Sequence, residues 1–85
     1  MKPADVALRA KEQLGSLTGL DVDTVSALEK QEDGWRVVVE LVEMKQIPDS
    51  SDVLGSYEAI LSDRGDLLSY RRTRRYQRSV VMDEQ

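Results

Sequence analysis

The chain has 85 residues, a net charge of −4 at pH 7, and neither cysteine nor histidine. This length accommodates one small domain, which we expect to span residues 1–85, with its core at about 3–78 and a loose tail at 79–85. The missing residue types exclude a disulfide framework, a Cys/His zinc site, a thiol nucleophile and an imidazole base, so we expect no catalytic, cofactor-binding or metal-binding residues.

The N-terminal segment, residues 3–17, carries a helical pattern. Its apolar residues recur at intervals of four, four and three positions: Val6, Ala10, Leu14 and Leu17. This spacing places them on one face of a helix. Pro3 suits the first turn, where its missing N–H is not needed, and Gly19 suits the left-handed position just after the last turn. The pattern predicts a helix with one apolar face.

Strand-like patterns follow from Asp21 onward. The first stretch is apolar and partly β-branched, without a helical period, and it ends at Asp33-Gly34, a strong hairpin signal. Residues 35–44 then alternate. One face would carry Trp35, Val37, Val39 and Leu41, and the other Arg36, Val38, Glu40, Val42 and Met44. This alternation predicts a central strand, with Trp35 as a core anchor under the helix.

Two further strands complete the expected fold. A loop at 45–51 precedes a third strand at 52–61, and a turn at 62–66 precedes a fourth strand from Leu67. Together these elements predict an α+β fold, an N-terminal helix packed on a four-stranded antiparallel β-meander. No signal peptide is evident, and the longest apolar-rich run is too short and too charged for a membrane span. We therefore expect no membrane insertion and a cytoplasmic location.

Positive charge is concentrated near the C-terminus. Residues 1–70 carry 14 acidic and 7 basic side chains, whereas residues 71–78 carry five arginines and no acid. We define the arginine cluster as Arg71, Arg72, Arg74, Arg75, Tyr76 and Arg78. Strict alternation would direct Arg72, Arg74 and Tyr76 to one face of the last strand and Arg71 and Arg75 to the other. The cluster is the main electrostatic feature of the sequence.

Three interpretations of the arginine cluster remain open. Its guanidinium groups can pair internally, for example Arg72 or Arg74 with Glu40 or Glu58 across the sheet. They can instead bind a protein partner, to which a last strand would also offer a free backbone edge. Nucleic acid is the less favoured partner, because the acidic remainder of the chain would repel a phosphate backbone.

Other polar residues carry weaker signals. Glu40 and Glu43 lie three apart in a strand, so they would point to opposite faces and cannot act as a paired acid and base. We expect both to be solvated or ion-paired. The loop between Ile47 and Asp52 is either a plain connection or a recognition loop, with Ile47, Pro48, Asp49 and Asp52 as secondary candidate residues.

The order of the motifs resembles the gas vesicle protein O family across about residues 4–78. The chain reads Leu17-Thr18-Gly19, Asp33-Gly34-Trp35, Glu40-Leu41-Val42-Glu43, Ile47-Pro48-Asp49 running into Tyr57-Glu58, then Asp63, Gly65 and Leu67, and finally Tyr70 to Arg78 with five arginines. Single pieces such as the Asp-Gly turns are common, but the ordered set is specific. Some members of the family carry a long acidic leader, and this chain begins almost at the domain.

The resemblance implies a non-enzymatic accessory role in gas vesicle assembly, without a cofactor. The implied partners are other gas vesicle proteins, wall or accessory, and the implied location is the cytoplasm, free or associated with the vesicle. A small nucleic-acid-binding regulator that uses the arginine cluster is the alternative from another functional class. The direct partner, the assembly step and the oligomeric state are not given by the sequence.

Overall fold

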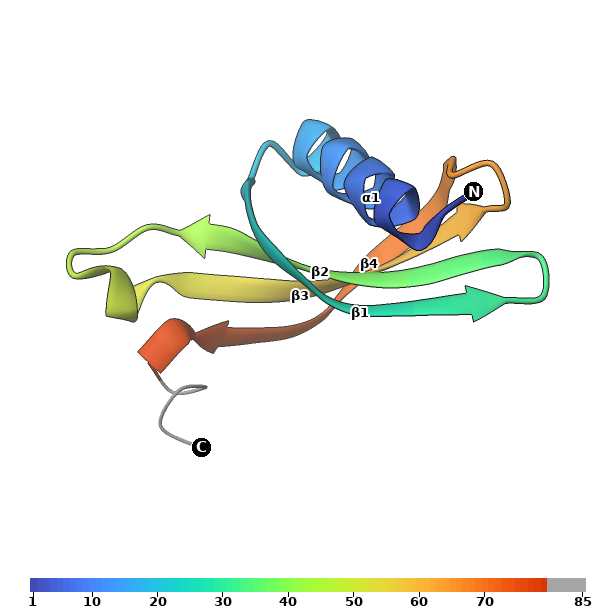
Figure 1. Cartoon of the computed structure of the whole chain (residues 1–85). Coiled ribbons are helices and arrows are strands. Elements are labelled where there is room, and N and C mark those ends of the chain that lie inside the picture. Colours follow the sequence, from blue (N-terminus) through green and yellow to red (C-terminus); the bar gives the residue numbers. More distant parts are fainter. Residues whose placement is uncertain (80–85) are drawn as a thin grey trace.

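The computed structural model describes residues 1–79 and contains one helix packed on one four-stranded sheet (Figure 1). The helix α1 spans Pro3–Thr18, and the strands are β1 (Asp21–Gln31), β2 (Gly34–Met44), β3 (Val53–Ser62) and β4 (Leu67–Gln77). All neighbouring strands pair antiparallel in the order β1-β2-β3-β4, and a short 3-10 turn, Asp49–Ser51, lies between β2 and β3. The predicted α+β meander is confirmed. Of the tail expected at 79–85, residues 80–85 lie outside the described residues.

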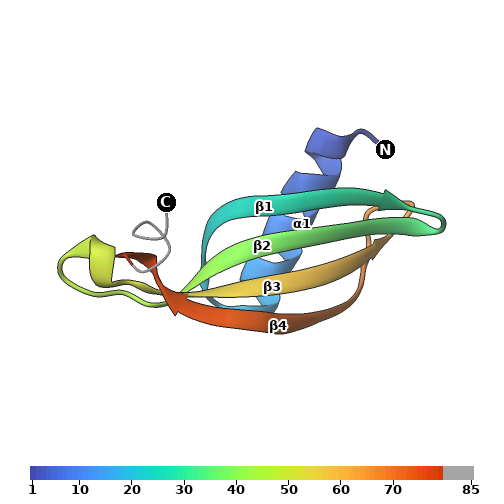
Figure 2. The ribbon, with the colours of Figure 1, turned by 90° about the horizontal axis from the view of Figure 1, so that it is seen from below.

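The hydrophobic core lies between α1 and one face of the sheet. The helix contributes Val6, Ala10 and Leu14, β2 contributes Trp35, Val37, Val39 and Leu41, and β3 contributes Ala59 and Leu61. Each set follows the period of its element, near 3.6 residues in the helix and 2 in the strands, so one face of each element is apolar. The expected burial of Trp35 is confirmed at 8% exposure. Figure 2 shows the opposite, open face of the sheet, with no helix in front of it.

Two glycines act at the ends of elements, for different reasons. Gly19 follows α1 with φ 71°, and its N–H donates to the Gly15 carbonyl at 2.9 Å, as a left-handed helix cap does. Gly34 begins β2 after the β1–β2 turn, but its φ is not positive. A side chain at Gly34 would collide with the backbone of Leu61 on β3. The Asp33-Gly34 signal therefore predicted the hairpin correctly, although Gly34 is needed for close strand approach.

The strict alternation expected along β4 is wrong. Ser56 of β3 pairs with Arg74, and Tyr57 pairs with Arg72, so Thr73 is an extra residue between two paired positions. Such a bulge shifts every later side chain to the other face. Arg72 and Arg75 therefore lie on the helix side of the sheet, whereas Arg71, Arg74 and Tyr76 lie on the open side. A second register shift occurs between the pairs Ile60–Ser69 and Leu61–Leu67.

Candidate protein-binding site

β4 is the most exposed strand of the sheet. It pairs with β3 along one edge, and it is the last strand in the sheet order, so its other edge has no strand partner among residues 1–79. Of its eleven residues, only Leu67 and Tyr76 are partly buried, and the four arginines within it are all exposed. The predicted edge position of the arginine cluster is confirmed. The side chains on its two faces have different partners.

On the helix side, two arginines share one carboxylate. Arg72 Nη1 lies 3.0 Å and Arg75 Nε 3.2 Å from the same oxygen of Glu43, whose other oxygen accepts a hydrogen bond from the Tyr57 hydroxyl at 2.7 Å. The Glu43 side chain is only 10% exposed, whereas both guanidinium groups are about half exposed. Among residues 1–79, this arrangement gives the two arginines one carboxylate to share and leaves most of their guanidinium N–H donors without a hydrogen bond.

On the open side, Glu58 is shared in the same way. Its carboxylate accepts Arg36 Nε of β2 at 2.6 Å and Arg71 Nε of β4 at 3.3 Å. The hydrogen bond from Arg36, aided by the one from Arg71, lowers the pKa of Glu58 below its ordinary value. Arg74 makes no ion pair with another described residue; its guanidinium carbon lies 4.4 Å from the centre of the Tyr76 ring, a cation–π contact.

On the open face, the partly buried Tyr76 contacts a polar cluster around the buried Glu40. Glu40 is 6% exposed, and its carboxylate accepts hydrogen bonds from Ser26 Oγ and Ser56 Oγ, each at 2.6 Å, and from the Tyr76 hydroxyl. The expectation that Glu40 is solvated or ion-paired is wrong, because three hydroxyl donors replace water around its charge. Burial, followed by the bond to Glu40, raises the pKa of Tyr76 to about 12. Tyr76 is thus turned toward the protein.

Arg78 connects the candidate loop to the sheet. Its Nη2 lies 3.0 Å from Asp23 of β1 and 3.3 Å from Asp52, and its backbone N–H donates to the Asp52 carbonyl at 2.9 Å. Asp52 is buried and also accepts the backbone N–H of Gln46 at 2.8 Å. Of the secondary candidates in this loop, Asp52 is held inside the structure, whereas Ile47 is fully exposed.

The internal pairing expected for the arginine cluster is partly correct. The acceptors for Arg71, Arg72 and Arg75 are Glu58 and Glu43, not Glu40, and those for Arg78 are Asp23 and Asp52. The bulge at Thr73 explains part of the difference, because it places Arg75 beside Arg72 on the side of Glu43 and Tyr76 on the side of Glu40. No periodic signal in a single sequence reveals such an insertion.

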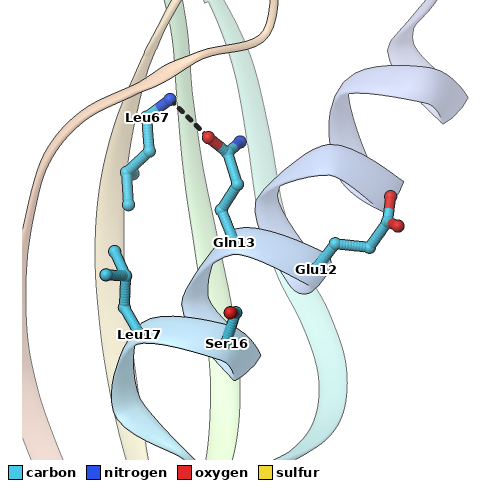
Figure 3. A pocket seen from close by; sticks show the side chains of 5 residues that line it. All are labelled: Glu12, Gln13, Ser16, Leu17 and Leu67. Carbon is cyan, nitrogen blue, oxygen red and sulfur yellow. Dashed lines mark hydrogen bonds between the residues drawn. The ribbon is translucent and has the colours of Figure 1, made fainter.

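Sequence reasoning missed a hollow between α1 and β4. It has a volume of about 380 Å3 and is lined by Glu12, Gln13, Ser16, Leu17 and Leu67 (Figure 3). Gln13 links α1 to the start of β4 on the other side of the hollow. Its Oε1 accepts the N–H of Leu67 and its Nε2 donates to the Gly65 carbonyl, both at 2.8 Å. Leu17 points toward Leu67 across the hollow and is 62% exposed. The exposure of Leu17 departs from its predicted place on the apolar stripe.

Residues 1–79 hold no cluster of three or more acidic side chains arranged for a metal ion. In the same range, no helix is long and apolar enough to cross a membrane. The fold and the site define a small two-layer α+β protein with a basic, exposed edge strand and an adjoining apolar hollow.

Comparison with known proteins identifies the family. The model of the family described as gas vesicle synthesis protein GvpO matches residues 1–82, and the chain belongs to this family. The chain is 45% identical over 76 residues to gas vesicle protein O of a Streptomyces species, covering 89% of this chain and 59% of that protein. The resemblance inferred from the ordered motifs is confirmed.

Two further relatives give the same result. The chain is 36% identical to gas vesicle protein O1 of Halobacterium salinarum, covering 89% of this chain and 64% of that protein. It is 35% identical to gas vesicle protein O of Haloferax mediterranei, covering 95% of this chain and 59% of that protein. The chain thus spans about three fifths of the length of these relatives. No solved structure matches it.

Proposed function

We propose that this chain is a non-enzymatic accessory protein of gas vesicle assembly that acts in the cytoplasm by binding other gas vesicle proteins, wall or accessory. The family and the names of the three relatives support a role in gas vesicle assembly. We further propose that the partner binds at the exposed arginines of β4, Arg71, Arg72, Arg74 and Arg75. Tyr76 and Arg78 support this strand from within.

The observation that carries the proposal is the incomplete neutralisation of β4. Glu43 serves two arginines through one oxygen, and Arg74 makes no ion pair with another described residue. Guanidinium groups in single, exposed contacts contribute little to folding, about 0–1 kcal/mol for each pair. They retain donors that can grip carboxylates of a partner in paired geometry.

A nucleic-acid role receives less support from the same contacts. Glu43 and Glu58 lie directly among the arginines that would hold phosphates, and their charge would repel a nucleic-acid backbone. A gel-shift titration with random duplex and single strands at rising salt tests this alternative. Salt-dependent binding that is lost in an Arg72→Gln/Arg75→Gln variant would support the regulator instead.

The main experiment is complementation of a deletion strain whose host carries the gene among its vesicle genes. We expect the deletion to abolish or stunt gas vesicles in electron micrographs, and the wild-type gene to restore them. The Arg72→Gln/Arg75→Gln variant should fail to restore vesicles, although its melting temperature stays close to that of the wild type. Arg71→Gln/Arg74→Gln tests the open side in the same way.

The matched control removes two exposed positive charges elsewhere, in Lys2→Gln/Arg64→Gln, and should restore normal vesicles. Normal vesicles in the deletion strain itself would overturn the proposed process. Normal vesicles with both β4 double variants would overturn the proposed site and move attention to the loop from Ile47 to Asp52.

A further inference from the structure

The outermost strand of the helix-side sheet face, β4, is largely uncovered by the described residues 1–79. The backbone of α1 makes its main contacts with β1 and β2, and the core includes side chains of α1, β2 and β3. From β4, only Leu67 packs against the edge of this core. The rest of β4 on this side is exposed, although it is continuous with the buried layer. A second helix beside α1 would extend this layer over β4.

The side chains on the uncovered side of β4 change from apolar to cationic along the strand. Five residues of β4 lie on the helix side, as their cross-strand partners establish. We call the first four of them the β4 stripe: Leu67, Tyr70, Arg72 and Arg75; the fifth, Gln77, ends the strand. Tyr70 is 41% exposed, and its ring lies 6.4 Å from that of the half-buried Tyr57. The stripe is therefore apolar at the end that adjoins the hollow of Figure 3 and cationic at the other end.

We infer that the β4 stripe and the hollow beside α1 receive an amphipathic helix of a partner protein, with apolar residues over Leu17, Leu67 and Tyr70 and carboxylates over Arg72 and Arg75. This inference rests on the proposed partner-binding function and names the class of segment that is bound. The stripe covers eight residue steps, about 26 Å in a strand. A helix of about 17 residues has the same length.

An extended partner strand on the free edge of β4 fits the structure less well. The two register shifts in the β3–β4 ladder increase the local twist and interrupt the regular spacing of backbone groups along this edge. The arginines on the edge also disfavour the addition of a strand that lacks carboxylates. An added strand would also leave the exposed Leu17 and the hollow uncovered. A helix over the stripe covers both, as helices in apolar grooves do.

A second copy of this chain is also a poorer occupant. Within residues 1–79 its only long helix is α1, whose apolar stripe is already buried in its own core. Its carboxylates, Asp5 and Glu12, are too few and too widely spaced to match an apolar face that ends in an acidic pair. Charge complementarity therefore favours a different protein with an acidic amphipathic helix.

Site-specific photo-crosslinking in vesicle-forming cells tests the inference. A photoreactive phenylalanine derivative is placed singly at Leu17, at Tyr70, at Leu8 and at Ser69, and the cross-linked segments are identified by mass spectrometry. Leu8 is an exposed leucine of α1 that does not line the hollow, and Ser69 lies on the open side of β4. We expect products at Leu17 and Tyr70 that contain one segment with helical apolar periodicity and acidic residues.

A synthetic peptide of the cross-linked segment gives the second readout. Its binding to the full chain, followed by fluorescence anisotropy, should weaken at least tenfold with Leu17→Gln and with Tyr70→Ala and stay unchanged with Leu8→Gln. Circular dichroism should show a gain of helix on binding.

Several results would overturn the inference. Equal products at Ser69 and Tyr70 would indicate a strand that borders both faces of β4, and products joining two copies would indicate self-association. Absence of products at Leu17 and Tyr70, or binding without helix gain, would also contradict it. If the Arg72→Gln/Arg75→Gln variant loses vesicles while these positions give no product, the partner site stands and only the helix fails.

Discussion

β2 and β4 are strands of the same length in the same sheet, yet they differ in almost every physical property. Ten of the eleven residues of β2 are buried or partly buried, because β2 has two strand neighbours and the helix packs on it, whereas nine of the eleven residues of β4 are exposed. β2 is held by apolar packing around Trp35 and Val39. β4 is held by its ladder to β3 and by polar contacts of its side chains. The apolar contacts that hold the fold are concentrated in the centre of the sheet, whereas most side chains of the edge strand remain exposed to solvent.

The strongest test of this contrast is Trp35→Ala in β2. Truncation of a large buried aromatic side chain costs about 3–5 kcal/mol, because apolar contacts are lost and a cavity remains. A small domain has a total stability near the lower end of about 5–15 kcal/mol, so we expect the variant to be largely unfolded. Chemical denaturation followed by circular dichroism measures the loss.

The matched change in β4 is Leu68→Ala, since Leu68 is 65% exposed. This truncation should alter the free energy of unfolding by about 0.5 kcal/mol or less. A loss comparable to that of Trp35→Ala would show that β4 is packed as tightly as β2. Strong quenching of Trp35 fluorescence by acrylamide in the folded wild-type chain would contradict the burial itself.

Tyr76→Phe tests a hydrogen bond between β4 and a buried carboxylate of the central strand β2. The change removes a hydroxyl donor from the buried Glu40 carboxylate and should cost about 1–3 kcal/mol. The control, Tyr70→Phe, removes a hydroxyl that makes no hydrogen bond with the described residues and should be neutral. Equal effects of the two changes on the midpoint of urea denaturation would contradict the role of Tyr76.

The alkaline response of stability depends on the same hydroxyls. Burial and hydrogen bonds to Glu43 and Glu40 raise the pKa values of Tyr57 and Tyr76 to about 12. Because an unfolded tyrosine ionises near pH 10, the folded state favours the neutral phenols. Their contribution to stability is complete below about pH 10 and is lost as the pH rises toward 12.

Urea denaturation at several pH values from about 9 to about 12 measures this decline in the free energy of unfolding. Tyr76→Phe should make the decline shallower, because one of the two groups no longer titrates. A free energy of unfolding that stays constant through this range would show that the two hydroxyls are not held in their neutral form by the fold.

The smallest expected effect compares two arginines on one carboxylate. Arg36 of β2 approaches Glu58 at 2.6 Å and is 31% exposed, whereas Arg71 of β4 approaches at 3.3 Å and is 74% exposed. Replacement of either by Gln should lower the free energy of unfolding only slightly, with the larger loss at Arg36. A larger loss for Arg36→Gln than for Arg71→Gln would show that the contact from the central strand contributes more to stability than the contact from the edge strand.

The acid response gives a second measure of the same pair. The lowered pKa of Glu58 contributes stability above the ordinary pKa of a glutamate, and this contribution is lost as the pH falls through the folded value. Arg36→Gln should reduce this acid loss more than Arg71→Gln does. The reverse order would mean that Arg71 is the main partner of Glu58.

The sequence predicted the elements and the core well, because both depend on short-range periodicity. The helix, the central strand and the burial of Trp35 follow from spacing along the chain, and β4 as the last strand follows from the order of turns. The faces of β4 could not be predicted beyond Arg72. The bulge at Thr73 depends on how β3 pairs with β4, and nothing local in the sequence marks it.

The candidate site was likewise predictable in part from the sequence, whereas the rest depended on strand pairing. The sequence alone located five arginines within eight residues. The ordered motifs indicated the family, which the comparison confirmed. The partners of those arginines were only partly anticipated. Glu43 was treated as a solvated or ion-paired residue of β2, and the structure places it under Arg72 and Arg75. Glu40, by contrast, is buried among hydroxyl groups.

By itself the sequence determined the class of fold, the composition of the core, the absence of cysteine and histidine chemistry, and the position of the basic segment on the last strand. These properties depend on residue types and on periods of 2 and 3.6, which are local. The tertiary structure alone decided which arginines share a carboxylate, which face each one occupies, and where the hollow between α1 and β4 lies. Those properties depend on strand register and on the path of the helix across a twisted sheet, which are set by contacts between residues far apart in the chain.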